Sequence, residues 1–173
     1  MAIRNYRRSL VGATIAAALL ASVVFHPQSI DARAQDSMSA AADETQQTEA
    51  GVMAVDNHWS IAELTGDTDY LNQMLLPEYR SVTTNGVAHP KDAIVAGAAK
   101  RKGTDLAKAK LDFATYKKEH PYGSAVVIQG NTAVVSFYDP TLGPQKGVKS
   151  SDVFVYIDGH WHAIYSQHTG LNG

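Results

Sequence analysis

Asp152, Tyr165 and Gln167 are the side chains of this sequence whose types and spacing are best suited to chemistry. They lie in two apolar runs joined by Asp158-Gly159, and an Asp-Gly pair between such runs is typical of a tight β-hairpin. Counting back from the turn predicts that Asp152 lies opposite Tyr165, with Gln167 on the same face, because side chains alternate between faces. Asp152 would then be a general base that removes a proton next to a carbonyl group, while Tyr165 or Gln167 binds the enolate oxygen. The alternative is a structural cluster in which the Tyr165 hydroxyl donates a hydrogen bond to Asp152.

A predicted helix over residues 49–65 supplies further candidates for a pocket. Asp56 and Glu63 lie about one turn either side of Trp59, so they border its apolar stripe and face either a pocket mouth or solvent. Tyr79 and Tyr138, near the ends of predicted strands, are either pocket-lining or half-buried aromatic residues. With the apolar members of the hairpin face added, the predicted pocket-lining residues are Asp56, Trp59, Tyr79, Tyr138, Phe154, Trp161, Tyr165 and Gln167.

The two faces of the C-terminal hairpin have different expected roles. The same counting sets Tyr156 opposite Trp161 and Phe154 opposite Ala163, on the face of Asp152. The opposite face would stay exposed if helices covered only one side of the sheet, and a homodimer across it is therefore expected. Its apolar members are Val153, Val155, Ile157 and Ile164.

The histidines of this hairpin do not predict a metal site. His160, His162 and His168 are expected on the face away from Asp152, where His168 would suit a dimer contact. His168 lies six residues beyond His162, about 20 Å along an extended strand, so the three imidazoles cannot share one ion. No cofactor and no metal are predicted. The sequence has no cysteine and no Gly-x-Ser-x-Gly motif, which argues against nucleophilic catalysis.

The N-terminus has the pattern of a cleaved export signal over residues 1–34. Arg4, Arg7 and Arg8 precede an apolar run over residues 10–25, and Ala32-Arg33-Ala34 fits cleavage before Gln35. The paired arginines also fit a twin-arginine signal, so either that route or the general secretory route would deliver a periplasmic or secreted protein. The alternative is a retained anchor; after cleavage no membrane association is expected. The formal net charge of −2 and the lack of a basic block beyond the signal give no footprint for nucleic acid.

Local patterns predict helices first and consecutive antiparallel strands afterwards. Residues 35–48 are polar and are interpreted as a flexible lead-in, and residues 49–173 as one domain. Residues 104–119 are ambiguous, because Ala and Lys favour a helix capped by Thr104 whereas alternating apolar residues favour a strand; the helix is preferred. The order predicts an α+β fold with helices on one face of a bent sheet. Helices are expected at 49–65 (ended by Gly66), 67–76, 91–102 and 104–119, and hairpins at 79–88, 124–138 and 151–169.

An ordered set of short motifs resembles the nuclear transport factor 2-like superfamily, in its SnoaL-like branch. Trp59, Gly66-Asp67 and Tyr79 come first, and the later motifs are Gly130-Asn-Thr-Ala-Val-Val135, Asp158-Gly-His-Trp161 and Ser166-Gln-His-Thr169. The resemblance covers about residues 50–169. It implies a cone-shaped α+β barrel, in which a curved mixed or antiparallel sheet wraps around N-terminal helices, with a pocket at the open end and usually a dimer.

The superfamily holds isomerase-, cyclase- and dehydratase-type enzymes beside members without a known reaction. This sequence has no obvious match to the isomerase Tyr/Asp/Asp set or to the cyclase Asp/His pair. We therefore expect an exported domain that binds a small apolar or carbonyl-containing molecule, with its reaction unknown. The alternatives are an enzyme that uses a pocket aspartate as general base, and a non-catalytic dimerisation module.

Overall fold

The computed structural model describes residues 43–169 of the chain, and the predicted export signal lies outside them. Within this part no helix is long and apolar enough to cross a membrane. The elements are α1 (Glu49–Thr65), α2 (Thr68–Met74), β1 (Leu75–Val82), β2 (Ala88–Pro90), α3 (Lys91–Ala99), α4 (Leu106–Glu119), β3 (Gly123–Gln129), β4 (Thr132–Tyr138), β5 (Val148–Ile157) and β6 (His160–His168).

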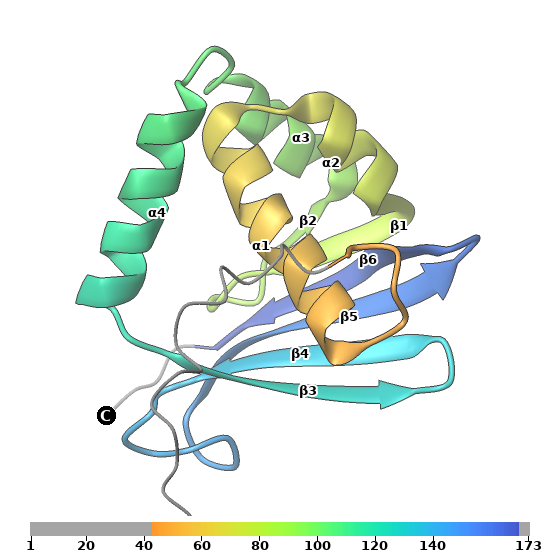
Figure 1. Cartoon of the computed structure of the whole chain (residues 1–173), viewed down its shortest axis with the longest axis vertical. Coiled ribbons are helices and arrows are strands. Elements are labelled where there is room, and N and C mark those ends of the chain that lie inside the picture. Colours follow the sequence, from red (N-terminus) through yellow and green to blue (C-terminus); the bar gives the residue numbers. More distant parts are fainter. Residues whose placement is uncertain (1–42, 170–173) are drawn as a thin grey trace, which may run out of the picture. The chain divides into compact units, whose positions relative to one another are not determined.

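The strands form one curved, open sheet in the order β2-β1-β6-β5-β4-β3. Neighbouring strands are antiparallel except β1 and β6, which run parallel, so the sheet is mixed. Figure 1 shows α1, α2 and α3 gathered over one face of the sheet, with α4 standing beside α1. The predicted α+β architecture, with helices on one side of a curved sheet, is confirmed.

Helix α1 provides the centre of the hydrophobic core because its apolar residues recur at the helical period. Val52, Val55 and Trp59 are buried against the sheet. The Trp59 ring meets Tyr79 of β1 and Phe154 of β5 edge to face, with ring centroids 5.6 and 6.1 Å apart. Edge-to-face pairs of this kind stabilise a core by about 0.5–1.5 kcal/mol each beyond their buried area.

Both ends of α1 are fixed by local chemistry. The Thr48 side chain accepts a hydrogen bond from the Gly51 amide at the first turn. Gly66 ends the helix at a φ of 71°, a conformation that favours glycine. A Cβ atom at Gly66 would lie 2.5 Å from the Lys102 amide nitrogen, so the position also requires a residue without a side chain. The predicted helix over 49–65 and its end at Gly66 are confirmed.

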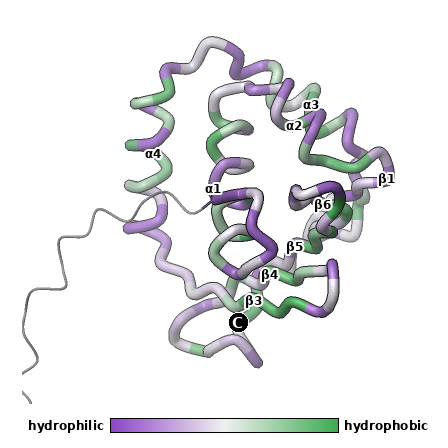
Figure 2. Tube along the Cα trace, turned by 45° about the vertical axis from the view of Figure 1, so that its right-hand side comes forward, coloured by the Kyte–Doolittle hydropathy of each residue, from purple (hydrophilic) through white to green (hydrophobic). Residues whose placement is uncertain are grey.

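Helix α4 resolves the ambiguous segment in favour of a helix, but its cap differs from the prediction. Asp105 caps it, since its Oδ1 accepts from the Lys108 amide at 2.8 Å. Thr104 was the predicted cap, and instead its hydroxyl donates to the Arg101 carbonyl at 2.8 Å and closes the turn after α3. Figure 2 shows hydrophilic residues spread along α4, and Ala109 is the one residue of α4 that is buried.

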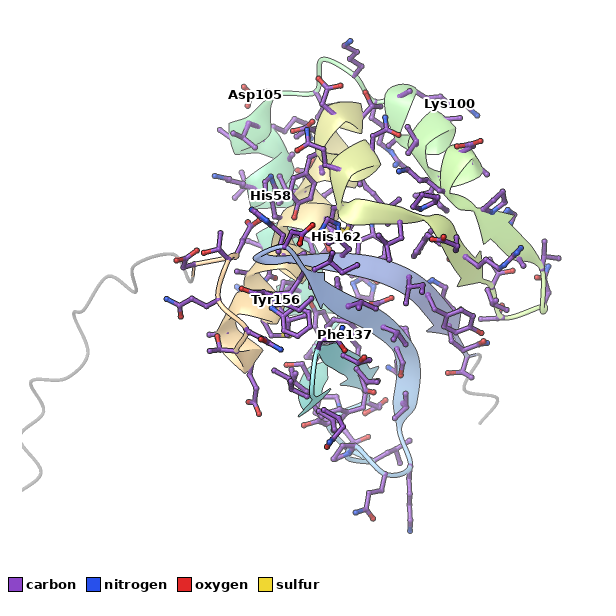
Figure 3. All side chains as sticks on the ribbon, turned by 90° about the vertical axis from the view of Figure 1, so that its right-hand side faces the viewer. His58, Lys100, Asp105, Phe137, Tyr156 and His162 are labelled. Atoms are coloured by element: carbon purple, nitrogen blue, oxygen red, sulfur yellow. The ribbon has the colours of Figure 1, made fainter. Side chains whose placement is uncertain are left out.

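The described end of the lead-in, residues 43–48, contacts the sheet, although its composition indicated flexibility. The indole N–H of Trp161 donates to the Gln46 carbonyl at 2.9 Å. The Tyr156 hydroxyl donates to the Thr45 carbonyl, and Figure 3 shows Tyr156 beside the chain that enters α1. Buried aromatic N–H and O–H groups need acceptors, and main-chain carbonyls supply them whatever the local composition.

The C-terminal hairpin begins as its turn predicts and then departs from that register. Asp158 and Gly159 both have positive φ, and the pairs Tyr156–Trp161 and Phe154–Ala163 are confirmed. Beyond them a β-bulge shifts the register, so that Val153 pairs with Tyr165 and Asp152 with Ser166. The predicted Asp152–Tyr165 pair is therefore wrong. Because the bulge inserts one residue, every later side chain of β6 changes face.

Candidate functional site

A cavity of about 1110 Å³ opens between α1, α4 and the helix-covered face of the sheet. Helix α1 contributes acidic and aromatic groups to one wall, the strands contribute the facing wall, and α4 with the turns after α4 and β4 forms the rim. The lining residues are Asp56, Trp59, Ser60, Glu63, Tyr79, Ser81, Ile94, Phe113, Tyr116, His120, Pro121, Tyr122, Phe137, Asp139, Pro140, Thr141, Lys149, Ser150, Asp152, Ser166 and His168.

Besides Asp139 at the rim, three carboxyl groups line this cavity. Asp56 and Glu63 come from α1, where a spacing of seven residues returns to the same helix face. Asp152 reaches the cavity from β5, and none of the three forms an ion pair within residues 43–169. The indole N–H of Trp59 donates to Glu63 Oε1 at 2.9 Å, so Glu63 is held against the aromatic stripe of α1.

Asp152 ends a buried chain of hydrogen bonds that begins at Tyr79. The Tyr79 hydroxyl donates to Ser166 Oγ at 2.9 Å, and the Ser166 hydroxyl donates in turn to Asp152 Oδ1. All three side chains are buried. Each hydroxyl can accept a proton as it gives one up, so the chain has the donors and acceptors that a proton relay requires.

Burial and mutual charge separate the acidities of the two aspartates. Burial raises the pKa of Asp152 from 3.8 to about 6, opposed by the Ser166 hydrogen bond and by the charge of His168. The pKa of Asp56 rises further, to about 8, first through burial and then through the negative charge of Asp152. Burial also raises the pKa of Glu63, against the Trp59 hydrogen bond. At neutral pH Asp152 is mainly ionised and Asp56 mainly protonated, the separation that assigns a base and an acid within one site.

Asp56 also differs from its neighbours in having no hydrogen-bond partner within residues 43–169. Its side chain is only 8% exposed, and the groups that shift its pKa act on it by burial and charge alone. Every side-chain oxygen of the described residues that is fully shielded from solvent has a hydrogen-bond partner. The Asp56 oxygens have none, so they are not fully shielded and remain in contact with the cavity. A buried polar group normally finds a partner, so this carboxyl is available to a ligand or to water.

Aromatic rings and a few cations complete the walls. The ammonium group of Lys117 lies 5.1 Å from the centroid of the Phe113 ring and 5.5 Å from that of Tyr122. At the rim, Lys149 forms an ion pair with Asp139 at 3.3 Å. Within the described residues no group of three or more His, Asp or Glu side chains is arranged to hold a metal ion.

The structure brings some of the predicted site residues together and separates others. Asp56, Trp59, Tyr79 and Asp152 all line the cavity. Phe154 and Trp161 are buried in the core rather than on the cavity wall. Tyr138 does not line the cavity either.

Tyr165 and Gln167 are the clearest correction. The β-bulge turns both to the outer face of the sheet, where the Tyr165 hydroxyl donates to Gln167 Oε1 at 2.5 Å, so neither can act beside Asp152. For the same reason the predicted orientation of His168 is wrong, because this residue and Ser166 line the cavity. The sequence contains no signal for the bulge.

The sequence matches no protein-family model and no curated protein. The fold is similar to that of solved structures. An NTF2-like protein of Cytophaga hutchinsonii ATCC 33406 is 13% identical with a TM-score of 0.50, over 73% of this chain and 100% of that chain. An NTF-2 like protein of unknown function from Silicibacter pomeroyi DSS-3 is 14% identical with a TM-score of 0.47, over 68% and 91%. A putative Ca/calmodulin-dependent kinase II association domain of Exiguobacterium sibiricum 255-15 is 11% identical with a TM-score of 0.48, over 70% and 92%. The similarity to the Cytophaga hutchinsonii protein extends over the whole length of that protein. Together with the curved mixed sheet and its helices on one face, this similarity shows that the chain has the cone-shaped α+β fold of the nuclear transport factor 2-like proteins.

Proposed function

We propose that this chain is an exported domain that binds a small molecule in the cavity between α1, α4 and the sheet. The observation that carries the proposal is the Asp56 carboxyl, which is nine-tenths buried, has no partner within residues 43–169 and faces a cavity of about 1110 Å³. Pockets for small molecules combine apolar walls with a few such polar groups. Burying a carboxyl without a partner costs stability, and a bound ligand would offset that cost.

The binding proposal is tested by native mass spectrometry of protein purified from its own cell envelope. The expected result is a non-covalent adduct of small mass that Asp56→Asn loses and Glu78→Gln keeps. Glu78 is a fair control because it is an exposed carboxylate on β1, outside the cavity lining. A protein without an adduct, and without thermal stabilisation by any member of a broad small-molecule library, contradicts the proposal.

Export is proposed from the sequence of residues 1–34. The expected mature protein begins at Gln35 and is found in the periplasm or the medium. Intact-mass measurement of the protein from a cell envelope fraction tests this directly. A chain that keeps its first 34 residues and stays in the membrane fraction corresponds to the retained anchor instead.

A second candidate function is proton transfer of the isomerase, cyclase or dehydratase type. It is favoured by the separated acidities in the cavity, with pKa values of about 6 for Asp152 and about 8 for Asp56. Asp152 would take a proton from carbon next to a carbonyl group, and protonated Asp56 would donate a hydrogen bond to the oxygen that gains charge. If so, the protein exchanges deuterium next to the carbonyl of a bound ketone, and Asp152→Asn abolishes the exchange while the ketone still binds.

A homodimer is proposed across the outer face of the sheet. Tyr165 and the apolar residues Val134, Val153 and Ile164 are only partly buried there, on the face opposite the helices. Apolar faces of this kind commonly meet a second copy. Sedimentation velocity should give a dimer that Val153→Asp converts to a folded monomer. A wild-type protein that is still monomeric at about 50 μM contradicts this proposal.

A further inference from the structure

The acidic groups inside the cavity have no ion-pair partner within residues 43–169, and Lys117 and Arg101 act on Asp56 and Glu63 by charge at longer range. Asp56, Glu63 and Asp152 form no ion pair within residues 43–169, whereas the rim carboxylate Asp139 is paired with Lys149. The basic side chains among the remaining lining residues are two imidazoles, His120 and His168. The cavity therefore carries more acidic than basic groups, and one of the acids is the unpartnered, nine-tenths buried Asp56.

The aromatic walls already bind one cation in the geometry that an organic ammonium ion requires. The Lys117 ammonium lies within 5.5 Å of the centroids of Phe113 and Tyr122, and both rings also line the cavity. Trp59 and Phe137 present further ring surface inside it. Cations within about 6 Å of a ring centroid are attracted to the negative face of the ring, so rings and carboxyl groups favour the same kind of guest.

We propose that the cavity takes a small organic cation, an ammonium or amidinium group paired with the Asp56 carboxylate and carrying an apolar body that packs on the aromatic walls. This inference rests on the proposed binding function and names its ligand class. Neutral carbonyl compounds are the competing class, because protonated Asp56 could instead donate a hydrogen bond to them. The cation is favoured by the number of carboxyl groups, since Asp56, Glu63 and Asp152 face one cavity and none of them has an ion-pair partner within residues 43–169.

Binding of such a cation should release a proton. The pKa of Asp56 is about 8 in the empty cavity, so its carboxyl is mainly protonated at pH 7. An ammonium ion beside it favours the carboxylate: the O–H bond of Asp56 breaks, the proton passes to solvent, and the carboxylate pairs with the cation. Affinity should therefore rise between pH 6 and 8, by up to tenfold per pH unit, and level off above pH 8.

The other groups around Asp56 do not reverse this sign. The charged or titratable groups that face it or line its cavity are Glu63 of α1, Tyr70 of α2, Tyr79 of β1, Tyr116, Lys117 and His120 of α4, Tyr122 and Asp139 of the adjoining turns, Lys149 and Asp152 of β5, and His168 of β6. Lys117 lowers the pKa of Asp56, and Asp152 and Glu63 raise it. The pKa of about 8 for Asp56 is the result of these opposing effects together, so the sign of the pH dependence stands.

The inference is tested by isothermal titration calorimetry of the purified protein with three probes of one shape. The probes are 2-phenylethylamine as the cation, 2-phenylethanol as the neutral analogue and 4-phenylbutan-2-one as the carbonyl compound. The amine is expected to bind at least tenfold more tightly than either neutral probe at pH 8. At pH 7, heats measured in two buffers of different ionisation enthalpy should report release of close to one proton.

Variants assign the effect to Asp56. Asp56→Asn should reduce the affinity for the amine at least tenfold and leave that for the alcohol unchanged, whereas the exposed control Glu78→Gln should change neither. If the alcohol or the ketone binds as tightly as the amine, the cation inference is overturned and the binding function stands. If no probe binds and no adduct is found by native mass spectrometry, the binding function itself fails. Amine binding that Asp56→Asn leaves intact overturns the assignment to Asp56.

Discussion

Replacing Asp56 by Asn should stabilise the protein, and increasingly so as pH rises. The pKa of Asp56 is raised from 3.8 in the unfolded chain to about 8 in the folded one, first by burial and then by the charge of Asp152. Between these values the folded state holds a proton that the unfolded state has lost, so the free energy of unfolding falls with rising pH. The stability that this bound proton contributes is fully present below pH 3.8 and is lost as pH approaches 8.

The size of the effect follows from one proton. One pKa unit corresponds to about 1.4 kcal/mol. The rise in the pKa of Asp56 from 3.8 to about 8 therefore lowers the free energy of unfolding by roughly 5 kcal/mol at pH 8. Asn has nearly the same shape as Asp and carries no charge, and no hydrogen bond within residues 43–169 is lost in the exchange. Between pH 6 and 8 alone, the stability difference between Asp56→Asn and wild type should grow by about 2–3 kcal/mol. The pKa of Asp152 is about 6, so that group contributes mainly below this range.

The assay is urea unfolding followed by circular dichroism at pH 5, 6, 7 and 8. All other titratable residues are the same in the two proteins, so the difference between the two curves isolates residue 56. Glu78→Gln, an exposed substitution on β1, should follow wild type throughout. Parallel pH dependences for Asp56→Asn and wild type would contradict this prediction, because they would mean that Asp56 has the same pKa in the folded as in the unfolded protein.

Three further substitutions test other parts of the structure. Ser166→Ala removes the hydroxyl that donates to Asp152, so the pKa of Asp152 should rise. The free energy of unfolding should fall by about 1–3 kcal/mol. An Asp152 carboxyl titration that ¹³C NMR finds unchanged contradicts the hydrogen-bond chain from Tyr79 to Asp152. Gly66→Ala should lower stability by about 2 kcal/mol or more in thermal unfolding, and by more than Gly86→Ala, because both have positive φ but only the first meets another main chain. Equal losses would refute that close approach. Trp161→Phe removes the indole N–H that holds the lead-in (residues 43–48), so its amides should exchange faster with solvent; unchanged exchange would show that this hydrogen bond does not hold the segment.

Features with local causes could be predicted from the sequence. The Asp158-Gly159 turn needs positive φ at both positions, and no neighbour elsewhere in the chain is required for that. Helix α1 follows from the period of its apolar residues and from Gly66. The position of Asp56 and Glu63 beside Trp59 likewise follows from helical geometry alone, which is why both were candidates for a pocket.

Features set by the whole sheet could not be predicted. The β-bulge near Val153 inserts a residue where β5 and β6 bend, and counting from the turn assumes an uninterrupted ladder. Strand β6 also pairs with β1 across an irregular parallel register, a contact between segments far apart in the chain. One inserted residue exchanged Tyr165 for Ser166 as the neighbour of Asp152 and moved His168 to the cavity face.

The acidity of the site is likewise a tertiary property. Most of the domain's sequence separates Asp56 from Asp152. Their proximity could not be predicted, because it arises only where α1 packs across β5. The contact of Lys117 with two rings depends on the turn after α4, which places Tyr122 near the ammonium group that Phe113 of α4 also contacts. Such groups come together only when the helices close over the curved sheet.

The cavity holds Asp56 as a buried carboxyl without a hydrogen-bond partner from residues 43–169. The most direct measurement is a ¹³C NMR titration of the aspartate carboxyl signals, with Asp56 assigned through its loss in Asp56→Asn. We expect Asp56 to titrate near pH 8 in the protein without added ligand, above Asp152 near pH 6. A titration of Asp56 near 4, the value of a free aspartate side chain, would contradict it.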